Sequence, residues 1–98
     1  MQFTKRLHEP IRAGVVTCSI RIWKRLRVKA GEAYRLGQGP GYIVVDSIDE
    51  IEFQNVSHAL AIESGFESVD DLMATARHGS GQDIYLIRFH YVDGDINQ

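Results

Sequence analysis

Three side chains with well-defined binding chemistry occupy every second position of one short stretch: Ser19, Arg21 and Trp23. Thr17 precedes them at the same spacing. Because side chains alternate across a β-strand, a strand here would present all four on one face. A guanidinium matches the planar shape of phosphate or carboxylate, an indole can stack on a flat ring, and hydroxyls supply hydrogen bonds. The stretch therefore indicates a site for an anionic or nucleotide-like ligand.

The intervening side chains of this stretch are apolar: Cys18, Ile20 and Ile22. They predict that the opposite face of the strand packs on a hydrophobic core. In that position Cys18 is expected to pack as a small apolar side chain, because a cysteine nucleophile needs a partly exposed, activating environment. Cys18 is also the single cysteine of the chain, which excludes an internal disulfide.

Basic residues continue beyond the stretch, at Lys24, Arg25, Arg27 and Lys29. They could contact a nucleic-acid backbone or form a solvated rim. Residues 1–35 carry nine Lys and Arg against two acids, a net charge of +7, whereas residues 36–98 carry a net charge of −9. This asymmetry favours a phosphorylated or polyanionic ligand at the basic surface, or a fold in which the two parts pair with each other.

Ser19 is the candidate nucleophile of the chain. A serine hydroxyl needs a general base, and Glu63, Glu9 or a histidine could reach it only through the fold. The alternative is that Ser19 contacts a ligand or a neighbouring side chain. Arg21 has two interpretations as well, an anion-binding group or the partner of a downstream acid. Trp23 could stack on a base or fill space beside the sheet.

No metal site or cofactor is expected. The histidines are scattered, and none of them pairs with the single cysteine at ligand spacing: they are His8, His58, His78 and His90. The glycine-rich stretch over 37–41 lacks the Lys-Ser/Thr ending of a P-loop and precedes a predicted strand, so a hairpin turn is favoured over a phosphate cradle.

The chain is expected to form a single domain over residues 1–98, with a polar tail from about residue 93. No apolar run approaches the ~20 residues of a membrane helix. The first residues lack the apolar centre of a secretory signal. Together with the lone cysteine, these features predict a cytoplasmic protein with no membrane partner. Its oligomeric state is left open.

The residues of the candidate site need a sheet to position them. Alternation and β-branched side chains predict strands over 2–7, 16–23, 33–36, 42–51 and 84–92. Helical spacing predicts a brief helical turn that begins at His8-Glu9-Pro10, with Pro10 suited to a first helical position, and stops at Gly14. It also predicts a helix over 55–64 and a helix from Ser68, ended by residues 78–81, whose apolar face includes Leu72. These elements predict an α+β fold: a small barrel of about five to six strands with two to three helices packed on it.

These residues resemble the ASCH family, a branch of the PUA-like superfold, over residues 10 to 91. In chain order the matching residues are Pro10-Ile11, Gly14, Arg21, Val28 to Glu32, Tyr34 to Gly37, Gly65-Phe66, Ser68 to Leu72 and Phe89. The resemblance implies a PUA-like β-barrel with helices closing one side. It also implies a cleft lined by the family's glycine-to-arginine motif, and binding of RNA or modified nucleosides.

The family motif runs Gly, any, Lys, two of any kind, Glu or a hydroxyl residue, any, Arg. Gly14 and Arg21 match its ends. Ser19 stands where the branch that removes acetyl from N4-acetylcytidine has its threonine nucleophile. The lysine position is Val16, which carries neither charge nor proton and so argues against the amidohydrolase mechanism. That branch also uses a glutamate at a position near Glu63, although matching this chain to the family pattern favours Ser64 at that position.

The resemblance therefore implies an RNA- or nucleotide-binding domain. In it Arg21 holds an anionic group, Thr17 and Ser19 hydrogen-bond, and Trp23 or Tyr34 lies against a ring. One alternative is a small hydrolase, a ribonuclease or an amidohydrolase of N4-acetylcytidine, using Ser19 with Glu63. A second alternative is a protein-interaction module with a degenerate cleft.

Overall fold

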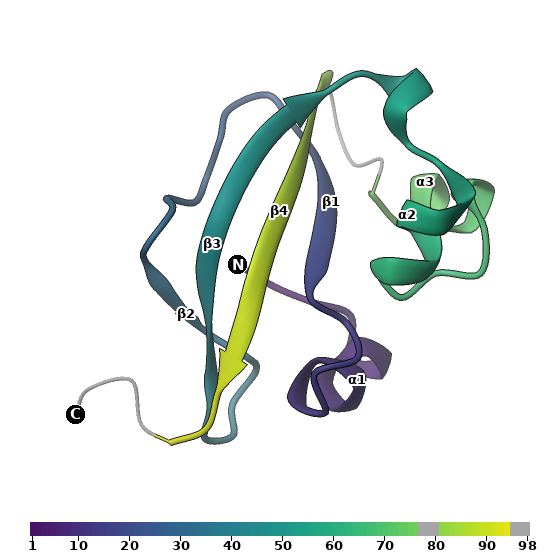
Figure 1. Cartoon of the computed structure of the whole chain (residues 1–98). Helices are drawn as coiled ribbons and strands as arrows, with labels where there is room; N and C mark the ends of the chain where they lie inside the picture. Colours follow the sequence, from purple (N-terminus) through teal and green to yellow (C-terminus); the bar gives the residue numbers. More distant parts are fainter. Residues whose placement is uncertain (77–80, 95–98) are drawn as a thin grey trace.

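The computed structural model describes residues 1–76 and 81–94. Its centre is an antiparallel sheet in the order β1-β4-β3-β2. The strands are β1 (Cys18–Trp23), β2 (Ala33–Arg35), β3 (Tyr42–Ile51) and β4 (Asp83–Val92). The long strands β3 and β4 pair in the middle, and β1 and β2 form the two edges. Figure 1 shows that the sheet curls into a half-barrel.

The helices of the described residues are short. They are η1 (Lys5–Leu7) and η2 (Phe53–Asn55), both of the 3₁₀ type, and α1 (His8–Arg12), α2 (His58–Glu63) and α3 (Val69–Ala76). In Figure 1, α2 and α3 lie together on the β1 side of the sheet, and α1 lies near one end of it. Within residues 1–76 and 81–94, no helix combines the length and the apolar character that a membrane crossing requires. The predicted α+β class is confirmed.

The sheet has fewer strands than the five to six predicted, because no strand forms over residues 2–7. In a strand, Phe3, Lys5 and Leu7 would share one face, so burying the two apolar side chains would also bury an ammonium group. The chain forms η1 and α1 instead, which bury Leu7 and Ile11, four residues apart. The sheet therefore remains an open half-barrel with β1 at its edge.

The four other predicted strands are confirmed, with ends shifted by two residues or fewer. The first helix begins at His8, so Pro10 is its third residue and not its first. This position is tolerated because the first N–H groups of a helix have no intrahelical acceptor. The helix predicted over 55–64 begins at His58, where the Ser57 hydroxyl accepts from the Leu60 N–H.

The helix predicted from Ser68 is confirmed as α3. The Ser68 hydroxyl accepts a hydrogen bond from the Asp71 N–H over 3.1 Å. The Asp71 carboxylate accepts from the Glu67 N–H, one residue before the position expected in a capping box. Leu72 is fully buried, as its place in the apolar pattern predicts. The predicted end of this helix covers residues 78–81, of which 78–80 lie outside the described residues, as do residues 95–98 of the predicted polar tail.

Both faces of the sheet bury apolar side chains. On the helix side, Cys18, Ile20 and Ile22 belong to the larger cluster, as the alternation of β1 predicts. On the concave side, a smaller cluster contains Val28, Val45, Tyr85 and Ile87, and Trp23 and Tyr34 pack against it. The smaller cluster shows that the loop between β1 and β2 folds over the concave face.

The glycine-rich stretch is the turn between β2 and β3, which confirms the predicted hairpin. Gly41 adopts a φ of +100°, a conformation that strongly favours glycine. A Cβ at this position would lie 2.0 Å from the Tyr91 hydroxyl oxygen. Packing against β4 therefore accounts for the glycine at this position.

Candidate functional site

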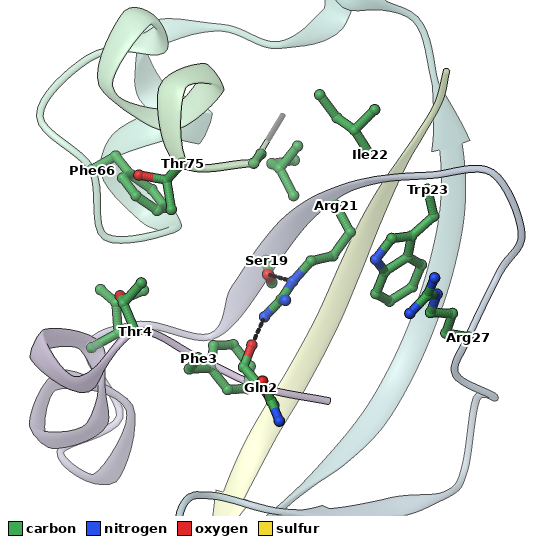
Figure 2. Close-up of a pocket in the computed structure, with 13 residues that line it drawn as sticks. Gln2, Phe3, Thr4, Ser19, Arg21, Ile22, Trp23, Arg27, Phe66 and Thr75 are labelled. Carbon is green, nitrogen blue, oxygen red and sulfur yellow. Dashed lines mark hydrogen bonds between the residues drawn. The ribbon is translucent and has the colours of Figure 1, made fainter. Parts of the chain in front are cut away.

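A cavity of about 520 Å³ follows the edge strand β1. Five consecutive residues of the strand line it, from Ser19 to Trp23. The remaining lining comes from four places: residues 2–4 and 7, Arg27, Phe66, and the end of α3 at Thr75 and Ala76. Because side chains from both faces of β1 contribute, the cavity wraps around the edge of the sheet. Figure 2 shows Phe66 and Thr75 across the cavity from Arg21.

Arg21 is held in this cavity by three contacts. Its Nε donates to the Ser19 hydroxyl oxygen over 2.8 Å, and its Nη2 donates to the Gln2 carbonyl oxygen over 2.5 Å. Its guanidinium carbon lies 4.9 Å from the centre of the Phe3 ring. Figure 2 shows the guanidinium extending from β1 towards the segment that carries Gln2 and Phe3. These contacts orient the group before any ligand binds.

The contacts of Arg21 leave part of its binding capacity unused. A guanidinium has five N–H donors, and two of them are occupied here. Its Nη1 has no hydrogen-bond acceptor within residues 1–76 and 81–94. The edge formed by Nη1 and Nη2 is the edge that binds a carboxylate or phosphate in a bidentate manner. Nη1 can therefore donate to an anionic ligand while Nε and Nη2 keep their present partners.

The charge of Arg21 is not neutralised by the described part of the chain. None of the described carboxylates lies within ion-pair distance of its guanidinium. Burial lowers the pKa of Arg21 from its ordinary value to about 10, so the group stays charged at neutral pH. A charge that loses hydration without gaining a counter-charge is unfavourable. An anion bound in the cavity would remove this cost.

Ser19 is buried, with 8% of its surface exposed, and it lines the cavity. Its oxygen accepts from Arg21, so its own O–H can still donate to a ligand. Glu63, the predicted base, is on the other side of the sheet. It accepts a hydrogen bond from Arg88 Nη1 over 3.4 Å, and Arg88 is the cross-strand partner of Cys18. The geometry does not bring Ser19 and Glu63 together.

Cys18 is fully buried on the helix side of β1. Burial raises the pKa of its thiol from the ordinary value to about 11, with a further increase from the charge of Glu63. The nearby charge of Arg88 acts in the opposite direction. The thiol is therefore protonated at neutral pH, and it is a poor nucleophile.

Val16, at the family's lysine position, is a core residue with 4% of its surface exposed. Its Cγ2 lies 3.2 Å from where a Cβ on Gly65 would be, and a Leu7 methyl group lies closer still. A lysine at this position would place an ammonium group among apolar side chains. Packing accounts for the valine.

A second cavity, of about 490 Å³, adjoins the first. It is lined by Leu26, Arg27, Val28, Lys29, Glu32 and Tyr34. Arg27 lines both cavities, so it marks the boundary between them. The Tyr34 hydroxyl oxygen accepts a hydrogen bond from the Lys29 N–H over 2.9 Å. Tyr34, predicted to lie with Arg21, therefore belongs to the second cavity.

The remaining predicted site residues lie outside both cavities. Thr17 is exposed, and its carbonyl oxygen accepts from the Phe89 N–H. Lys24 and Arg25 are exposed in the loop after β1. Of the four predicted backbone-contacting residues, the structure brings Arg27 and Lys29 to a cavity.

Apart from Arg27, none of the first cavity's residues outside β1 is predicted as a site residue from the sequence. Gln2 and Phe3 fall in a predicted strand, and no pattern in the sequence indicates that they hold Arg21. Phe66 and Thr75 reach the cavity because α2 and α3 lie beside β1, a tertiary arrangement that local patterns do not encode.

In the described residues, His, Cys, Asp and Glu side chains do not gather in groups of three that could hold a metal ion. His90 pairs with Asp46 over 2.8 Å, at the bulge of β3.

Comparisons of the chain with protein-family models, with curated proteins and with solved structures gave no match.

Proposed function

We propose that this domain binds RNA or a nucleotide-like ligand in the cavity along β1. The observation that carries the proposal is Arg21: a half-buried guanidinium that is oriented by Ser19 and Gln2 but has no carboxylate partner in the described structure. Such a group is complementary to a phosphate or another planar anion.

The cavity walls fit the rest of a nucleotide. Trp23, Phe3 and Phe66 line the cavity; Arg21 lies over the Phe3 ring and Arg6 over the Phe66 ring. A base can stack on Trp23, and base–aromatic stacking tolerates any base sequence. The Ser19 and Thr75 hydroxyls supply polar contacts. The volume of about 520 Å³ lies in the range of ordinary small-molecule pockets and is too small for a duplex. The ligand portion that enters is therefore a single unpaired nucleotide.

The likeness of the motif residues to the ASCH family supports the same function and stays a prediction. We infer on that basis that the half-barrel is a diverged PUA-like domain. The buried Val16 and the separation of Ser19 from Glu63 favour binding over amidohydrolase chemistry.

The test is the binding of a fluorescein-labelled single-stranded RNA, measured by anisotropy at several salt concentrations. We expect affinity to fall as salt rises, because phosphate contacts release counterions. Arg21→Gln should weaken binding by about tenfold or more, as expected for a lost charge-assisted bond. Arg88→Gln changes the net charge equally on the other side of the sheet and should leave affinity within about twofold. Equal losses in the two variants would contradict the proposal.

A further inference from the structure

We propose that the two adjoining cavities form two nucleotide subsites, so that the unit recognised is a 5′-phosphorylated dinucleotide segment of a single strand. This inference rests on the proposed function and specifies its ligand. The terminal phosphate lies at Arg21 and the first base against Trp23. The linking phosphate lies at Arg27, and the second base lies against Tyr34.

The positions of the aromatic side chains support this arrangement. Trp23 lines the first cavity and Tyr34 lines the second, and both pack against the same small cluster on the concave face. Trp23 is further supported by Tyr85, at a ring separation of 6.2 Å. The hydrogen bond from the Lys29 N–H orients the Tyr34 hydroxyl. Each cavity thus has an aromatic platform that is fixed by its neighbours, Trp23 in the first and Tyr34 in the second.

The cations alternate with these platforms. Arg21 lies in the first cavity, Arg27 lines both cavities, and Lys29 lines the second. In a single strand, phosphates likewise alternate with bases. Arg25, two residues before Arg27 in the same loop, lines neither cavity. The loop after β1 therefore brings Arg27 and Lys29 to the cavities and leaves Arg25 outside them, although all three belong to one basic run in the sequence.

The second cavity also contains an acid, Glu32. A carboxylate repels a phosphate but accepts hydrogen bonds from the exocyclic amino group of a base such as cytosine. Glu32 therefore favours a base beside it in the second cavity, with the phosphates nearer to the cationic side chains Arg27 and Lys29. It predicts a preference for cytosine over uracil in the second position.

Isothermal titration calorimetry on the whole chain tests the proposal with three probes: uridine 5′-monophosphate and the 5′-phosphorylated dinucleotides uridylyl-uridine and uridylyl-cytidine. We expect uridylyl-uridine to bind about tenfold more tightly than the mononucleotide, since it adds one stacked base. Arg27→Ala should remove most of this gain. The matched Arg25→Ala should preserve it. Glu32→Ala should abolish a preference of about fivefold for uridylyl-cytidine, the worth of one base contact.

The outcomes separate the two proposals. If none of the three probes binds, the proposed function itself fails, and the subsites fail with it. If the mononucleotide binds in an Arg21-dependent manner but the dinucleotides bind no more tightly, the two-subsite proposal alone is overturned. Equal effects of Arg25→Ala and Arg27→Ala on the dinucleotides would also overturn it. Because both arginines lie in an exposed loop, circular dichroism should show unchanged folding in both variants.

Discussion

Arg21 donates from Nε to the hydroxyl oxygen of Ser19, two positions earlier on the same face of β1. This bond joins the residue predicted to bind an anion to the residue predicted to be a nucleophile. The bond therefore assigns both residues to the same function, the binding of an anion. Ser19 positions the guanidinium, and the guanidinium keeps its Nη1 edge available for a ligand.

Arg21→Met should weaken ligand binding by about tenfold or more without destabilising the free protein. Methionine fills similar volume and removes a charge that has lost hydration without gaining a counter-charge, and such replacements are often neutral or stabilising. We expect the Tm of the free protein to stay within about 3 °C of the original or to rise, which corresponds to less than 1 kcal/mol in a domain of this size. Thermal denaturation with and without uridine 5′-monophosphate measures both effects. A large fall in Tm with binding retained would assign Arg21 a purely structural role.

Ser19→Ala should weaken ligand binding by about threefold to tenfold, the worth of one or two hydrogen bonds. The substitution removes the acceptor that orients Arg21 and the O–H that can reach a ligand. Because Glu63 faces the other side of the sheet, we expect a mixed RNA pool to remain intact with either protein. Denaturing gel electrophoresis at high protein concentration checks this. Cleavage that disappears in Ser19→Ala would establish a hydrolase.

The faces of β1 could be predicted from the sequence, because alternation alone separates Ser19 and Arg21 from Cys18 and Ile20. The partners of Arg21 could not be predicted from the sequence. Gln2 accepts through its backbone carbonyl, a group that every residue carries, and its position depends on how the N-terminal segment crosses the concave face. The extra predicted strand failed for a related reason, since alternation over six residues competes poorly with the burial of Leu7 and Ile11 by helical turns.

Contacts between residues far apart in the sequence are harder to predict than the local structure of a strand or helix. Only the resemblance to the ASCH family suggests pairing Glu63 with Ser19, and in the structure Glu63 accepts from Arg88 on the helix side of the sheet. Lys24, Arg25 and Arg27 look equivalent in sequence. The path of the loop after β1 decides that Arg27 lines both cavities.

Cys18 predicts a pH dependence of stability above pH 9. Its pKa is raised in the fold from 9.0 to about 11, so the folded state favours the protonated thiol. This contribution is complete below pH 9 and is lost as the pH rises through 11. Relative to Cys18→Ala, the protein should lose about 1 to 2 kcal/mol of unfolding free energy between pH 8 and pH 10.5. Urea denaturation of both proteins at the two pH values measures the difference, and a constant difference would contradict the assigned environment.

Gly41→Ala should destabilise the fold more than Gly31→Ala. Both glycines have positive φ, but a Cβ on Gly41 would overlap Tyr91, whereas a Cβ on Gly31 has no neighbour within 4 Å. Gly31→Ala should cost about 1 kcal/mol from backbone strain, and Gly41→Ala at least about 1 to 3 kcal/mol more from overpacking. Urea denaturation compares them. If Gly41→Ala instead left stability unchanged and reduced ligand affinity, the turn would have to be reassigned as a binding loop.

The central claim is that an anion binds at Arg21. Its most direct test is a titration of ¹⁵N-labelled protein with uridine 5′-monophosphate, followed by NMR at the Arg21 Nε–H signal. We expect this side-chain signal and the backbone amides of Ser19 and Phe3 to shift together along one saturable curve. The signals of Arg88 and Glu63, on the other side of the sheet, should stay in place. Saturable shifts centred on Arg88, or an unchanged Arg21 signal at saturation, would contradict the claim.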